Sequence, residues 1–169
     1  GLYSLSAPNH KPIAQAQWQT IGENQITGAI SDLYLHNNNL YIATDHGLYT
    51  CDISQPLTTP HFPLHPNDLN AANQLRHLCM DDDGVLWMTS PTGLHALLPN
   101  RQIAHFHYSD LPEGGFSSIC YVHDTLYLGT FHQGVYFFSI SNASYGLYKS
   151  CLQPISALQA IGNDTLLIA

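Results

Sequence analysis

The 169-residue sequence predicts an all-β fold built from repeated antiparallel sheets. The main observation is a short recurring phrase, in which a leucine and further apolar residues are followed by a loop and a glycine. Its leading leucine stands at positions 40, 86, 126 and 166, which are intervals of 46, 40 and 40 residues. Such a period is typical of solenoids and propellers. The second observation is that no window shows the i, i+3, i+4, i+7 apolar spacing of an amphipathic helix.

The first strand of each unit is a run of apolar and aromatic residues. Each run ends in a cluster rich in Asn or Asp, such as Asp81–Gly84, and these residue types favour tight turns because they tolerate positive φ. A calcium-binding loop would need a further acidic ligand at its twelfth position, where Thr92 stands, so the cluster is interpreted as a turn. The expected first strands are Ile30–Leu35, Leu75–Met80 and Phe116–Val122.

The second strand of each unit is the recurring phrase itself, and a glycine opens the third strand a few residues later. The expected third strands are Gly47–Cys51, Gly93–Leu98 and Gly134–Ile140. A less regular fourth strand follows in each unit, at about Thr59–Leu64, Ile103–Tyr108 and Tyr145–Cys151.

Four short antiparallel strands in each unit describe the blades of a β-propeller. The sequence holds about three to four blades, and propellers usually have four to eight, so we expect an incomplete ring completed by further blades of the same propeller. Residues 1–169 are interpreted as part of one domain, with units at about 1–28 (a tail and linker), 29–73, 74–114, 115–153 and 154–169 (partial). Strand content should exceed about 40%, against the usual 20–25%.

Several positions of the repeat are expected to be structural. The leading leucines and the apolar residues two positions later (Ile42, Met88 and Leu128) should be buried between blades. The glycines should have positive φ, or should lie where a neighbour leaves no room for a Cβ atom. The structural positions are Leu40, Gly47, Leu86, Trp87, Gly93, Leu126 and Gly134.

Composition excludes several function classes. Only 9% of the residues are charged, the formal net charge is −8, and four residues are Lys or Arg. Nucleic acid and anionic membranes are recognised by clustered Lys and Arg, so neither is an expected partner. No apolar run reaches the 18 or so residues of a membrane helix, so attachment to a membrane would need segments outside this chain.

No cofactor, metal site or catalytic set is expected. The cysteines at 51, 79, 120 and 151 lack the paired spacing of a zinc site and are expected to be unpaired, buried side chains. His105 and His107 share a strand face, but no further ligand pattern accompanies them. Glu23 and Glu113 are the only glutamates, and they occupy different positions of their units, so nothing selects an acid and base pair. We therefore expect a non-enzymatic segment.

The loops between the second and third strands are the candidate ligand-binding elements. They differ between units while the flanking leucine and glycine recur, which is the pattern of a binding surface on a constant scaffold. Unconstrained turns would give the same pattern, and this alternative stays open. The candidate contacts, which include one residue at the start of a first strand, are Asp45, His46, Arg76, Thr92, Phe131 and His132.

The segment Leu75–Leu94 resembles the repeat of two-component regulator propellers. It has the pattern apolar-x-x-apolar, then Asp-x-x-Gly-x-Leu-Trp-x-x-Ser, then Gly-Leu. The other copies depart from it, since Tyr41 and Tyr127 replace Trp87. The Gly-His and Trp-Asp pairs of WD40 repeats are absent, and the double glycine of kelch repeats occurs once.

This resemblance implies the periplasmic sensor region of a bacterial hybrid histidine kinase or related regulator, a class that often senses breakdown products of polysaccharides. Together with many Tyr, Asn, Gln and His residues, it predicts a module that binds a polar, carbohydrate-like ligand and passes the signal to a kinase or regulator output. Two alternatives remain. One is a scaffold for protein interaction or homodimerisation, and the other is a propeller-fold polysaccharide lyase or hydrolase.

Overall fold

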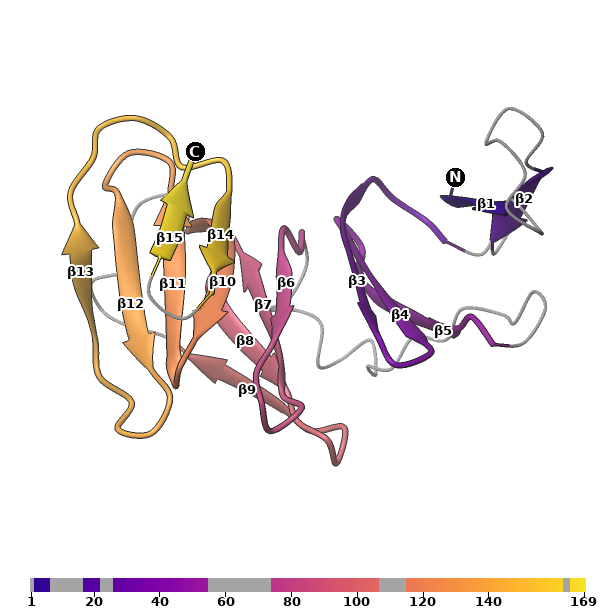
Figure 1. Cartoon of the computed structure of the whole chain (residues 1–169), viewed down its shortest axis with the longest axis horizontal. Coiled ribbons are helices and arrows are strands. Elements are labelled where there is room, and N and C mark those ends of the chain that lie inside the picture. Colours follow the sequence, from indigo (N-terminus) through magenta and orange to yellow (C-terminus); the bar gives the residue numbers. More distant parts are fainter. Residues whose placement is uncertain (1, 7–16, 22–25, 55–73, 107–114, 163–164) are drawn as a thin grey trace.

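The computed structural model describes residues 2–6, 17–21, 26–54, 74–106, 115–162 and 165–169, and the side chains of those from residue 26 onward. These residues form antiparallel β-sheets and no helix, as expected. The two complete blades are four-stranded, and the sheets β3–β5, β6–β9 and β10–β13 follow one another across the molecule in sequence order (Figure 1). The fold is an incomplete β-propeller.

Each sheet is formed by strands that are consecutive in the sequence. The first is a hairpin of β1 (Leu2–Ser6) and β2 (Gln17–Ile21), and the next contains β3 (Ile30–His36), β4 (Asn39–Thr44) and β5 (Gly47–Asp52). The two complete blades contain β6 (Leu78–Met80), β7 (Leu86–Ser90), β8 (Gly93–Leu97) and β9 (Ile103–Phe106), then β10 (Phe116–Val122), β11 (Thr125–Thr130), β12 (Val135–Ser139) and β13 (Tyr145–Lys149). A hairpin of β14 (Leu158–Ile161) and β15 (Thr165–Ile168) follows.

The expected strands differ from the observed ones mainly at their ends. The first strand of the second unit begins at Leu78 rather than Leu75, because Leu75 donates its N–H to Thr44 of the preceding blade, 3.0 Å away. Comparable irregularities interrupt β3 after Ile30 and β10 after Phe116. The last strand of the third unit ends at Lys149. The expected strand Thr59–Leu64, and the last two residues of the expected Ile103–Tyr108, lie outside the described residues.

The two faces of each second strand pack on different blades. In β7, Leu86 and Met88 pack backward with Ala43 of the preceding blade, whereas Trp87 packs forward with Phe138 of the next one. Because successive side chains of a strand point to opposite faces, this alternation follows directly from the recurring phrase.

Leu40 is an exception to the expected burial of the leading leucines. It is partly exposed, whereas Leu86 and Leu126 are at most 1% exposed. Leu40 lies on the backward face of its blade, where the described side chains that pack beside it, including Ile26 and Ile30, come from the same blade and the segment before it. Ile42 and Tyr49 of the same cluster are at most 1% exposed, so the exposure is confined to the beginning of β4, where Leu40 lies.

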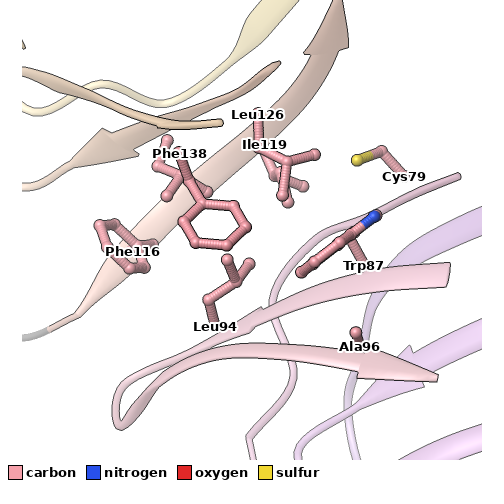
Figure 2. Packing of buried hydrophobic residues seen from close by; sticks show 9 residues of the cluster. Cys79, Trp87, Leu94, Ala96, Phe116, Ile119, Leu126 and Phe138 are labelled. Carbon is pink, nitrogen blue, oxygen red and sulfur yellow. The ribbon is translucent and has the colours of Figure 1, made fainter. Parts of the chain in front are cut away.

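Trp87 is the centre of the largest core cluster, as its place in the repeat predicts. Its ring is 3% exposed and lies 5.4 Å from the ring of Phe106 and 5.6 Å from that of Phe138 (centroid distances). We number the blades from β3–β5 as the first, β6–β9 as the second and β10–β13 as the third. Figure 2 shows Trp87 between the second and third blades, near Cys79 and opposite Ile119. The Nε1–H of Trp87 donates to Oδ2 of Asp81 at 2.7 Å, so its polar atom is satisfied inside the core.

The segment Asp81–Gly84 is a tight turn, as interpreted. The N–H of Gly84 donates to the carbonyl of Asp81, and Gly84 has a φ of 78°. Asp81 closes the turn with its Oδ1, which accepts hydrogen bonds from the N–H groups of Asp83 and Val85. The turn therefore aims the other carboxylate oxygen at the indole of Trp87.

All four cysteines are free thiols, as expected, and Cys51, Cys79 and Cys120 are buried, whereas Cys151 is partly exposed, contrary to the expectation. Burial raises the pKa of Cys79 well above its ordinary value, and burial also raises the pKa values of Cys51 and Cys120. Since the thiolate is the reactive form, Cys79 should react slowest with a thiol reagent in the folded protein. In denaturant all four groups should react at a common rate. Titration with a chromogenic disulfide reagent checks this, and fewer than four thiols in denaturant would contradict it.

Candidate functional site

From β3 onward, the first strands of successive sheets lie next to one another. Contacts join β3 to β6, β6 to β10, and β10 to β14, which makes these the innermost strands of the blades. A cavity of about 310 Å³ opens where they begin, and we call it the axial cavity. It is lined by Ser31, Arg76, His77, Ser117, Phe131, Pro154, Ile155 and Ser156.

A repeated hydrogen bond joins the blades at this cavity. The side chain of the second residue in an innermost strand donates a hydrogen bond to a backbone carbonyl at the start of the next innermost segment. Ser31 Oγ donates to Leu75 O at 2.5 Å, and Ser117 Oγ donates to Ile155 O at 2.5 Å. We call these bonds the blade latches.

Arg76 makes the latch between the second and third blades, at the position equivalent to the two serines. Its Nη1 donates to the carbonyl of Phe116 at 3.2 Å. Its guanidinium carbon also lies 4.6 Å from the ring centroid of Phe131, which belongs to the loop between β11 and β12. Burial of the guanidinium lowers the pKa of Arg76. The stacking fixes a cationic group on the wall of the axial cavity.

His77 is held beside Arg76 by the preceding blade. Its Nδ1 lies 3.5 Å from Oδ2 of Asp32, and the same oxygen accepts the N–H of Leu78 at 2.8 Å. Burial raises the pKa of Asp32, but hydrogen bonds from His77, Leu78 and Leu33 outweigh burial and hold the pKa below its ordinary value. At neutral pH Asp32 is therefore a carboxylate that ties the first blade to the second.

The structure brings two of the six predicted ligand residues together, Arg76 and Phe131, which meet at the axial cavity. The other four lie elsewhere. Thr92 contacts Ser90 of its own blade at 2.9 Å, and His132 lines a separate cavity of about 500 Å³.

The side chains of Asp45 and His46 contact the segment that precedes their own blade. Asp45 accepts a hydrogen bond from the N–H of Ala29 at 2.8 Å, and His46 Nδ1 lies 3.3 Å from the hydroxyl of Thr27. The carbonyl of Asp45 also accepts the N–H of Gln74, so this loop positions the segment that enters the second blade.

The sequence reasoning missed the serines of the axial cavity. A signal for them exists, because three of the four innermost segments begin with an apolar residue followed by serine: Ile30–Ser31, Phe116–Ser117 and Ile155–Ser156. The second unit replaces this serine by Arg76. The arginine in one unit, at a position that is serine in the others, is the sequence signal that identifies this position as a candidate functional one.

Another groove, of about 320 Å³, lies between the first and second blades. Tyr41, Asp52 and Arg101 are among its lining residues. It contains none of the predicted ligand residues and does not touch the blade latches. Within the part of the chain that the structure describes, no helix has the length and apolar character that a membrane span requires.

Consecutive antiparallel sheets of up to four strands, with adjoining first strands and an axial cavity, place the chain among β-propellers. The fold is similar to the extracellular domain of BT4673 from B. thetaiotaomicron, classed as a hybrid two-component system, with a TM-score of 0.67 and 14% identity, covering 88% of this chain and 21% of that one. It is also similar to the extracellular domain of BT3049 from the same organism, classed likewise, with a TM-score of 0.65 and 20% identity, covering 82% and 20%.

The computationally designed protein Ika4 is a third similar structure. Its TM-score is 0.61 at 12% identity, covering 85% of this chain and 92% of Ika4. No protein-family model matches the sequence, and no curated protein is similar to it in sequence. This chain spans about a fifth of the two extracellular domains.

Proposed function

We propose that this chain is part of the periplasmic sensor propeller of a two-component-type signalling protein. In this proposal it binds a polar, carbohydrate-like ligand at the axial cavity, has no enzymatic activity, and passes the signal to a kinase or regulator output. The extracellular domains of similar fold and the resemblance of Leu75–Leu94 to the regulator propeller repeat support the sensing role.

The single observation that supports the binding role is that one of the three blade latches is made by an arginine, Arg76, where the other two are made by serines. Ser31 and Ser117 make the latch with a hydroxyl group, so an arginine is not needed to join two blades. Arg76 makes the latch and in addition presents a stacked guanidinium to the cavity. A binding site requires such an oriented polar group on a largely preformed wall.

Thermal-shift and calorimetric titration of the purified protein with a panel of oligosaccharides test the proposal. We expect at least one oligosaccharide to raise the melting temperature in a concentration-dependent way, because a ligand that binds only the folded state stabilises it. The same ligand should be bound without being cleaved or otherwise changed.

Binding should weaken when Phe131 is replaced by leucine, which removes the ring beneath Arg76 but keeps an apolar side chain. Leu152→Ala is the control, because Leu152 is 90% exposed and does not line the axial cavity. A protein that binds no saccharide but captures a protein partner tightly would refute the proposal and favour the interaction scaffold.

A further inference from the structure

The chemistry of the axial cavity narrows the class of ligand, on the premise that the proposed sensing function holds. Among the basic residues that the structure describes (Arg76, Arg101 and Lys149), Arg76 is the one on the cavity wall. The described residues that line the cavity include no Asp and no Glu, although the chain as a whole has a formal net charge of −8. Arg76 is therefore the permanently charged side chain among the described residues of this wall.

The guanidinium of Arg76 has a defined orientation. Its stacking distance of 4.6 Å to Phe131 and its 3.2 Å hydrogen bond to Phe116 O hold the group from two sides, both in the third blade. The donors of a guanidinium lie in its plane in a fork that matches the two oxygens of a carboxylate. Holding the plane in advance reduces the entropy lost when such an anion binds.

The cavity also supplies groups that suit sugar hydroxyls. The hydroxyl groups of Ser31 and Ser117 donate to backbone carbonyls, and each hydroxyl oxygen has acceptor capacity besides that bond. Ser156 is exposed at the start of the next innermost segment, and His77 adds an imidazole. Groups that can bind hydroxyls therefore line the same cavity as the oriented guanidinium of Arg76.

We propose that the axial cavity binds an acidic sugar, an oligosaccharide with a uronate residue whose carboxylate pairs with Arg76 and whose hydroxyl groups contact the serines. A neutral sugar offers hydroxyl groups to the guanidinium but no pair of anionic oxygens that match its fork of donors. The carboxylate is therefore the feature by which this cavity distinguishes acidic from neutral oligosaccharides.

The test is calorimetric titration of the purified protein with short oligouronates based on galacturonate, glucuronate and mannuronate. The matched ligands are the same oligosaccharides with their carboxyl groups reduced to alcohols. We expect one oligouronate to bind, and its reduced counterpart to bind at least about tenfold more weakly, because reduction removes the charge from the hydrogen bonds to the guanidinium. Affinity for the oligouronate should also fall as salt is added.

Two variants separate recognition from folding. Arg76→Ser restores the hydroxyl that makes the latch in the neighbouring blades, so it should keep the fold, yet it should weaken oligouronate binding at least about tenfold. Arg101→Ser removes the same charge in the groove between the first and second blades and should leave binding unchanged. The melting temperature of each variant reports whether it is folded.

The outcomes distinguish this inference from the proposed function. If reduced and acidic oligosaccharides bind equally well, or if folded Arg76→Ser binds the oligouronate as the unaltered protein does, the acidic-sugar inference fails and the sensing function stands. If neither acidic nor neutral oligosaccharides bind, both proposals fail. Binding of acetate alone with the affinity of the oligouronate would also overturn the inference, because the sugar would then contribute nothing.

Discussion

Replacement of Trp87 by alanine is expected to lower the free energy of unfolding by about 3–5 kcal/mol, as large-to-small changes in a core do. The ring is 3% exposed and packs against Phe106 and Phe138, so its removal leaves a cavity between two blades. The change also leaves the buried Asp81 without its indole donor. Urea unfolding followed by circular dichroism measures the loss.

Two further variants show which part of Trp87 matters. Trp87→Phe keeps a ring but removes the Nε1 donor, and we expect it to cost about 1–3 kcal/mol, the range for an unsatisfied buried polar group. Leu152→Ala is the control and should change the free energy of unfolding by less than about 0.5 kcal/mol, because this side chain is 90% exposed. If Trp87→Ala were as mild as Leu152→Ala, the blade packing described above would be wrong.

Replacement of Gly134 by alanine is expected to cost about 2–5 kcal/mol, for two reasons that add. The recurring glycines have positive φ, as the sequence predicts, with 123° at Gly47, 142° at Gly93 and 101° at Gly134. At Gly134 a Cβ atom would also overlap the carbonyl oxygen of Lys149 and approach the backbone nitrogen of Cys151 to 2.6 Å. Backbone of the outermost strand and the segment after it would have to move.

Gly84→Ala is the matched control for Gly134. Gly84 also has a positive φ, 78°, but a Cβ atom there meets no atom within 4 Å. Only the conformational strain remains, so we expect a cost of about 1–2 kcal/mol. Chemical denaturation of the two variants side by side isolates the contribution of crowding. If the two variants lowered the free energy of unfolding equally, the backbone around β12 and β13 would accommodate the added Cβ atom without cost, contrary to the prediction.

Local features of the sequence suffice to predict the blades. Period-two alternation and the turn residues are local properties, so the strands around Leu86, Trp87 and Leu126 could be predicted in type and order. The same alternation explains why Leu86 and Trp87 pack on different neighbours. Strand ends were less predictable, because the start of β6 depends on the hydrogen bond between Leu75 and Thr44 of the preceding blade.

The assembly of the candidate site depends instead on how the blades pack against one another. Arg76 and Phe131 are separated by more than fifty positions in the sequence, and they meet because adjoining blades bring an innermost strand against the next blade's loop. The hydroxyls of Ser31 and Ser117 reach backbone carbonyls of following segments, and although an apolar-Ser pair recurs at these positions, the pair does not specify which carbonyl each hydroxyl contacts. Local sequence dictates which face of a strand is apolar, whereas the stacking of blades dictates which residues converge at the axis.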